Sequence, residues 1–93
     1  MAKKIVVKKQ FEKAYRQLSS SDRRFTDDAL KHLEDYLKTG RAPVGFGLKH
    51  LGSGIYEFRI SLALRAVYIA DQDRVFLSLL GAHDDVRRFL KRR

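Results

Sequence analysis

Cationic and imidazole side chains gather in the second half of the sequence. Arg59 and Arg65 lie in two segments in which apolar and polar residues alternate, and His83 follows the last such segment. Lys49 and His50 precede the first of these segments. Arginine binds two phosphate oxygens at once, and histidine gains or loses a proton near neutral pH. Together, these residue types favour chemistry on a phosphate ester.

Cleavage of an RNA phosphodiester by the adjacent 2′-hydroxyl fits this set of side chains. The reaction needs a base for the hydroxyl proton, cations for the charge that grows on the phosphate, and an acid for the 5′-oxygen. We expect no metal and no cofactor, because the sequence lacks a nucleotide-binding loop, a zinc motif and a cluster of carboxylates. Taken singly, each of these residues is more often a solvated charge. The histidine of the first half, His32, follows Lys31 in a charged helix and is interpreted as structural or solvent-exposed.

The charge of the chain points to a polyanionic partner. The 93 residues include 20 Lys and Arg against 11 Asp and Glu, which gives a net charge of +9. Such a balance favours nucleic acid, a membrane surface or an acidic protein. No apolar run approaches the ~20 residues of a membrane span or the ~7–15 of a signal peptide core, so we expect a cytoplasmic protein with no membrane partner. The absence of cysteine excludes disulfides and a thiol nucleophile.

The first half of the chain has helical periodicity after a short β-branched run at 5–7. Apolar residues in 11–18 predict one amphipathic helix, which ends in a cluster of three serines. Ser21 is the predicted N-cap of a second helix, whose apolar stripe ends before Gly40. The two helices should form a helical hairpin.

The second half changes to a period of two residues. Strands are predicted at 55–61, 64–70 and 74–80, and segment 48–51 is a candidate for one more short strand. A closing helix follows Asp84, with acidic residues at its start. The order β-α-α-β-β-β-α predicts an α+β fold with the helices on one face of a curved antiparallel sheet, in a single domain over 1–93.

This arrangement predicts one basic concave surface on the open face of the sheet. Side chains alternate across a strand, so Glu57 and Arg59 should share one face while the helices cover the other. The expected surface comprises Lys49, His50, Arg59, Arg65 and His83.

These segments resemble the RelE/ParE toxin superfamily. The run LKHLGSGIYEFRI at 48–60, followed by LRAVY at 64–68, is similar to the family's Leu-Lys segment, glycine turn, Tyr-x-x-Arg strand and Arg-x-x-Tyr strand. The run GAHDDV at 81–86 resembles the family's closing Gly-x-His-x-x-Val segment. With the helical hairpin, the resemblance covers essentially the whole chain.

The resemblance implies the toxin of a type II toxin–antitoxin system. It is closest to the RelE-, YoeB- and YafQ-like branch, whose members cut mRNA in the ribosomal A site. It therefore implies a metal-independent mRNA endoribonuclease that inhibits translation, with mRNA on the 30S subunit and an acidic antitoxin as partners. Two alternatives stay open: a ParE-like toxin that binds DNA gyrase without catalysis, and a degenerate RNA-binding module.

The resemblance also implies roles for individual residues. Arg65 matches the arginine that stabilises the scissile phosphate, and His83 matches the acid/base histidine of YoeB- and YafQ-like members. Arg59 matches a further basic residue and joins these two in the expected catalytic set. The residues expected to bind substrate are Lys49, His50, Arg87, Arg88 and Phe89.

Three departures leave the general base unassigned. Phe46 stands where YoeB-like members have a carboxylate base, and Glu57 stands where RelE has a lysine. Phe89 is the nearest match to an aromatic residue in the closing helix, and its ring cannot transfer a proton. His50 and Glu57 are the two candidates for the base.

Overall fold

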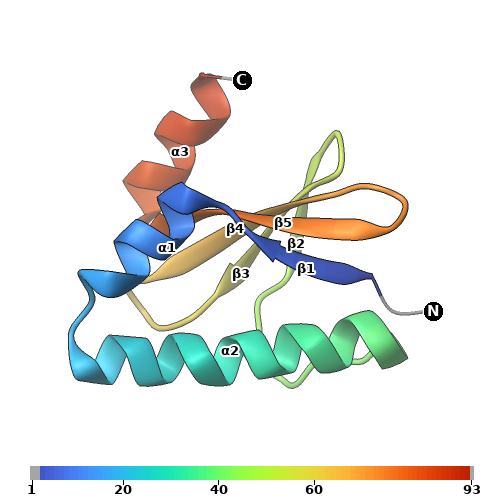
Figure 1. Ribbon diagram of the computed structural model, residues 1–93, viewed down its shortest axis with the longest axis horizontal. Helices are drawn as coiled ribbons and strands as arrows, with labels where there is room; N and C mark the ends of the chain where they lie inside the picture. The colour runs from blue at the N-terminus through green and yellow to red at the C-terminus, as the bar shows by residue number, and fades with distance from the viewer. Residues whose placement is uncertain (1–2, 93) are drawn as a thin grey trace.

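The computed structural model describes residues 3–92 and shows a five-stranded sheet between two layers of helix (Figure 1). Two helices pack on one face of the sheet, and the third packs on the other. In chain order the elements are β1 (Lys4–Val7), α1 (Lys9–Arg16), α2 (Ser20–Thr39), β2 (Lys49–Gly52), β3 (Ile55–Arg59), β4 (Arg65–Ala70), β5 (Arg74–Gly81) and α3 (His83–Lys91).

The strands lie in the order β1-β5-β4-β3-β2. Strands β2 to β5 pair in antiparallel fashion, and β1 pairs with β5 in parallel, so the sheet is mixed. The α+β class is confirmed, and the candidate strand at 48–51 is present as β2. The observed order therefore has four successive strands after the helices, one more than the predicted β-α-α-β-β-β-α.

The helical hairpin begins and ends largely where the sequence places it. Helix α2 ends at Gly40, whose φ of 76° is the left-handed conformation that glycine adopts readily. Its N-cap is Ser19, whose Oγ accepts from the Asp22 backbone N–H at 3.1 Å. The prediction of Ser21 was wrong because all three serines of the cluster can cap a helix, and only Ser19 has extended backbone before the first turn.

The main core lies between the sheet and the helices α1 and α2, on what we call the α1–α2 face. Phe58 of β3 is fully buried there, with the Phe46 ring stacked on it at 5.0 Å. Phe11 of α1 and Leu33 of α2 belong to the same cluster. The burial of these large apolar side chains fixes the helices on this face.

A second, smaller core lies on the opposite face, which we call the α3 face. Val86 of α3 packs there against Ile55, Val67 and Leu79. The expectation that every helix covers one face was therefore wrong. Only Ala82 separates β5 from α3, and the amphipathic pattern of a helix specifies its apolar side without specifying which face of the sheet it meets.

Candidate functional site

Strands β3 and β4 place two arginines directly opposite each other. Arg59 pairs with Arg65 in the antiparallel register, and both belong to the α3 face. Side chains opposite each other in such a pair have Cβ atoms only about 4.5–5.5 Å apart, and like charges there repel. The two arginines therefore concentrate positive charge at one end of the sheet.

Glu57 offsets part of this repulsion from the same face. The Glu57 side chain is 6% exposed, and its Oε2 lies 3.5 Å from Nη1 of Arg65. Lys49 of β2 pairs with Glu57 in the register from the other side. The burial of a carboxylate is costly unless it is paired, so Glu57 restricts Arg65. This pair was not predicted, although the hairpin spacing between β3 and β4 is a signal that could have revealed it.

Exposure separates the two arginines. The Arg65 side chain is 18% exposed and is held by Glu57. The Arg59 side chain is exposed and forms no ion pair among residues 3–92. Arg59 can therefore meet a ligand in solvent, while Arg65 is oriented beforehand.

His83 reaches the same end of the sheet through the end of β5. Gly81 pairs with Arg65 in the β4–β5 register, and His83 is the first residue of α3 two positions later. A Cβ at Gly81 would lie 2.6 Å from Oδ2 of Asp85, so only glycine allows this close turn. The same Oδ2 accepts from the Ala82 backbone N–H at 2.8 Å and fixes the start of α3. His83 is exposed at this turn.

His50 does not join this surface. It pairs with Tyr56 on the α1–α2 face, and its ring stacks on that of Tyr56 at 4.5 Å. Tyr56 stacks in turn on Tyr68 at 5.1 Å. Because neighbours in a strand point to opposite faces, Lys49 lies on the α3 face and His50 does not. The expectation that both residues line one surface was wrong.

The other expected residues lie on α3 or away from the site. Arg87 and Arg88 are exposed, and Arg88 pairs with Asp85. Phe89 is half-buried and packs against the smaller core of the α3 face. His32 is exposed on α2, with its ring edge toward Phe46 at 6.4 Å.

Residues 3–92 hold neither a cluster of metal-ligating side chains nor a helix that could span a membrane. Across residues 3–92, no three His, Cys, Asp or Glu side chains gather as ligands for a metal ion. Among the helices described, none has the length and apolar character needed to span a membrane.

The fold is shared with several solved toxin structures, although no protein-family model matches the sequence and no curated protein matches it. A mutant of Escherichia coli RelE in the free state is similar over 99% of this chain and 98% of its own, with 22% identity and a TM-score of 0.69. The YoeB dimer from Staphylococcus aureus is similar over 89% and 99%, with 21% identity and a TM-score of 0.65. E. coli YafQ in complex with DinJ is similar over 92% and 98%, with 16% identity and a TM-score of 0.65.

These similarities extend over nearly the full length of each toxin chain. The resemblance found in the sequence is thus confirmed for the fold. The chain has the fold seen in the toxin structures of RelE, YoeB and YafQ.

Proposed function

We propose that the chain is the toxin of a type II toxin–antitoxin system and that it cleaves mRNA in the ribosomal A site. The observation that carries the proposal is the convergence of Arg59, Arg65 and His83 at one end of the α3 face. The fold shared with RelE, YoeB and YafQ supports it. The reaction class is metal-independent attack of a 2′-hydroxyl on the adjacent phosphate.

Each residue has a distinct role in this proposal. Arg65 holds the scissile phosphate and stabilises the charge that develops on it. His83 moves a proton to or from a reacting oxygen. Arg59 and Lys49 bind the neighbouring backbone, and the exposed arginines of α3, Arg87 and Arg88, extend this contact together with Phe89.

Glu57 is the candidate base that lies on the same face as Arg65. Its burial and its pairing with Arg65 support a second role, in which it holds the guanidinium in position. His50, the other candidate, lies across the sheet from Arg65. The proposal therefore keeps Glu57 at the site and sets His50 outside it.

Expression in cells separates the proposed function from its alternatives. We expect growth arrest, loss of protein synthesis in pulse labelling, and cuts in translated mRNA but little cutting of free RNA. Continued protein synthesis with arrested DNA synthesis would instead favour a ParE-like toxin that acts on gyrase. Binding of RNA without cleavage in either setting would favour a degenerate RNA-binding module.

Substitutions at the ion pair test the chemistry. Arg65→Ala removes a charge that stabilises the transition state, so we expect a loss of about 10²–10³-fold in single-turnover cleavage on programmed ribosomes. Glu57→Gln keeps the shape and removes the charge that holds Arg65. A positioning role predicts a smaller loss with an unchanged pH profile, whereas a general base predicts a loss comparable to Arg65→Ala and an altered profile.

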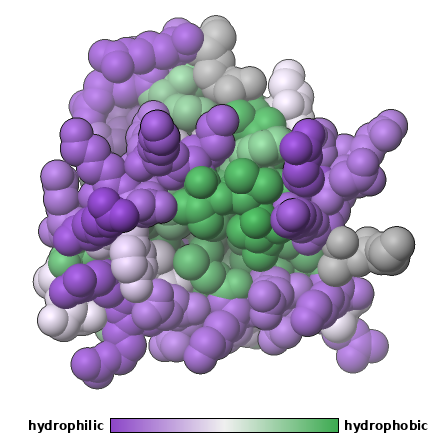
Figure 2. All heavy atoms as spheres, in the orientation of Figure 1, coloured by the Kyte–Doolittle hydropathy of each residue, from purple (hydrophilic) through white to green (hydrophobic). Residues whose placement is uncertain are grey.

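An acidic antitoxin is the proposed protein partner. Figure 2 shows an apolar strip across the middle of the molecule, over β1 and the adjacent part of α2. Val7 is 48% exposed in this region, and it lines a hollow there with Ile5 and Leu30. β1 is also an edge strand with one unpaired side. This surface suits an acidic segment that folds on binding and pairs with the edge.

Co-purification with the product of the neighbouring gene tests this partner. Val7→Asp places a charge in the apolar strip and should abolish co-purification. Val44→Asp makes the same change at an exposed loop position and should leave co-purification intact. Equal recovery of the complex with both variants would place the antitoxin elsewhere.

A further inference from the structure

The imidazole of His83 depends on the backbone of its own turn for its position. The side chain is exposed, and across residues 3–92 it forms no hydrogen bond, ion pair or ring contact. The turn at 81–83, where β5 passes into α3, begins at Gly81, the register partner of Arg65. Whatever holds this turn therefore holds His83 near Arg65.

Asp85 holds the turn with both oxygens of its carboxylate. Oδ2 accepts from the Ala82 backbone N–H at 2.8 Å, and Oδ1 pairs with Arg88. Ala82 is the N-cap of α3 and has no side-chain oxygen, so the side-chain hydrogen bond at this helix start comes from Asp85. The Ala82 carbonyl accepts from the Val86 N–H at 3.1 Å. Both backbone polar groups of the residue before His83 are thus engaged.

Gly81 provides the space that the carboxylate occupies. A Cβ at Gly81 would lie 2.6 Å from Oδ2, 2.9 Å from Cβ and 3.0 Å from Cγ of Asp85. The φ of Gly81 lies outside the left-handed region, so its backbone conformation is open to other residues. Glycine is needed here because Asp85 packs against it.

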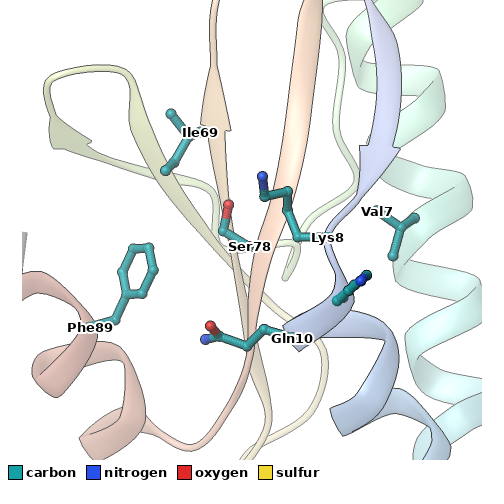
Figure 3. Close-up of a pocket in the computed structure, with 7 residues that line it drawn as sticks. Val7, Lys8, Gln10, Ile69, Ser78 and Phe89 are labelled. Atoms are coloured by element: carbon teal, nitrogen blue, oxygen red, sulfur yellow. The ribbon is translucent and has the colours of Figure 1, made fainter.

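The rest of α3 is held by apolar contacts away from this turn. Val86 is buried in the smaller core with Val67. Phe89 projects from α3 beside the sheet, where it lines a hollow with Ile69 (Figure 3). Loss of the Asp85 carboxylate should therefore leave α3 packed on the sheet and loosen its first turn, which carries His83.

Asp84 is a neighbouring carboxylate without these contacts. It lies in the first turn of α3, it is exposed, and its side chain forms no hydrogen bond or ion pair within residues 3–92. A carboxylate in the first turn stabilises a helix through the helix dipole, and Asp84 and Asp85 share this effect. The hydrogen bond to the turn distinguishes Asp85.

We propose that Asp85 is a positioning residue for His83. It fixes the turn so that the imidazole stays within reach of the phosphate that Arg65 holds, and Gly81 allows the carboxylate to reach the Ala82 N–H. The inference rests on the proposed function, in which His83 moves a proton. Asp85 contacts no reacting atom, so its effect on the rate passes through His83.

Single-turnover cleavage on programmed ribosomes, measured over a range of protein concentrations, tests the proposal. Asp85→Ala should lower the maximal rate by about 10–100-fold, the cost of a displaced catalytic group. The protein concentration at half the maximal rate should change less than about threefold. Asp85→Asn keeps an oxygen for the Ala82 N–H and should stay within about threefold of the wild-type rate. The matched control, Asp84→Ala, should stay within about twofold.

Two double-mutant cycles show which contact carries the effect. In the His83→Ala background, Asp85→Ala should cost less than about twofold more, because the group that it positions is absent. Gly81→Ala should reproduce the loss of Asp85→Ala, since its Cβ displaces the carboxylate, and it keeps Asp85 in the chain. In the Asp85→Ala background, Gly81→Ala should cost less than about twofold more.

Hydrogen exchange at the Ala82 amide tests the geometry without cleavage. Asp85→Ala and Gly81→Ala should each speed this exchange by at least about tenfold, the effect of one lost hydrogen bond to a charged group, and Asp84→Ala should not. Unchanged exchange in both of the first two variants would overturn the proposed contact.

Three results on programmed ribosomes would also overturn the proposal. They are an equal loss in Asp84→Ala, multiplicative losses for His83→Ala and Asp85→Ala, and a wild-type rate in Asp85→Ala. Each of them leaves the proposed nuclease standing, provided that His83→Ala is impaired. A wild-type chain that cleaves no mRNA, or a His83→Ala variant with the wild-type rate, would instead refute the proposed role of His83, and the positioning role with it.

Discussion

The two faces of the sheet are built from alternate residues of the same strands, and they differ in what those residues do. On β3, Tyr56 and Phe58 point to the α1–α2 face, where stacked rings fill the core. Glu57 lies between these two residues in the sequence, and Arg59 follows them. Both point to the α3 face. The first face is closed by two helices, and the second is covered only in part by α3.

Within the short strand β3, one set of alternate residues therefore stabilises the fold and the other set serves the proposed chemistry. A buried aromatic ring stabilises the fold through the apolar area that it removes from water. A cation that binds phosphate must stay accessible, and a buried ion pair such as Glu57–Arg65 adds little net stability. Changes on the α1–α2 face should therefore alter folding, and changes on the α3 face should alter activity.

The largest expected effect on activity comes from His83. His83→Ala removes acid–base transfer and should lower single-turnover cleavage by about 10²–10⁴-fold. It should also flatten the rate profile between about pH 5 and 8, where a histidine changes charge. His32→Ala, on α2, should change neither quantity. If His83→Ala cleaves within about threefold of wild type with its profile intact, the histidine is structural and the search for the acid moves to other residues.

The largest expected effect on stability comes from Phe58. This side chain is fully buried and contacts the rings of both Phe46 and Tyr68. Phe58→Ala should lower the free energy of unfolding by about 3–5 kcal/mol in urea titrations. Phe25→Ala is the matched control, because Phe25 is half exposed, and it should cost less than about 1 kcal/mol. Comparable losses in the two variants would contradict the location of the main core.

The α1–α2 face should also make the fold sensitive to alkali. Burial raises the pKa of Tyr68 above its ordinary value of 10.0, and the nearby Tyr36 and Tyr56 raise it further. The folded state then keeps a proton that the unfolded state loses, so stability is complete below about pH 10 and falls as the pH rises, by up to about 1.4 kcal/mol per pH unit. Tyr68→Phe should remove this part of the fall in urea titrations between about pH 10 and 11.5, whereas Tyr36→Phe, which removes only a smaller cause of the raised pKa, should leave most of it. An identical fall in wild type and Tyr68→Phe would assign the alkaline sensitivity to other groups.

The sequence predicts which face of the sheet a side chain occupies where this follows from the alternation of residues along one strand. It predicts the face less well where this depends on the segment with which the residue pairs or packs. The shared face of Glu57 and Arg59 follows from the spacing of two residues and is confirmed. The side of the sheet that α3 covers depends on how the chain turns at Gly81, which is set by contacts with Asp85 that no local pattern reveals. The position of His50 depends on the bounds of β2 and on its register with Tyr56. A four-residue strand gives too little alternation to fix either.

The neighbouring residues Lys49 and His50 therefore give the most direct comparison of the two faces, because one lies on each. His50 stacks on Tyr56 on the α1–α2 face, so His50→Ala should lower the free energy of unfolding by about 0.5–1.5 kcal/mol through lost stacking. It should leave cleavage on programmed ribosomes within about twofold of wild type, because exposed substitutions away from a site have small effects. Lys49→Ala should do the opposite: it keeps stability and lowers cleavage by about tenfold, the effect of one lost charged contact to phosphate. Urea titration and single-turnover cleavage on the same two variants measure both. A loss of cleavage with His50→Ala and none with Lys49→Ala would reverse the assignment of the faces and return His50 to the position of a candidate base.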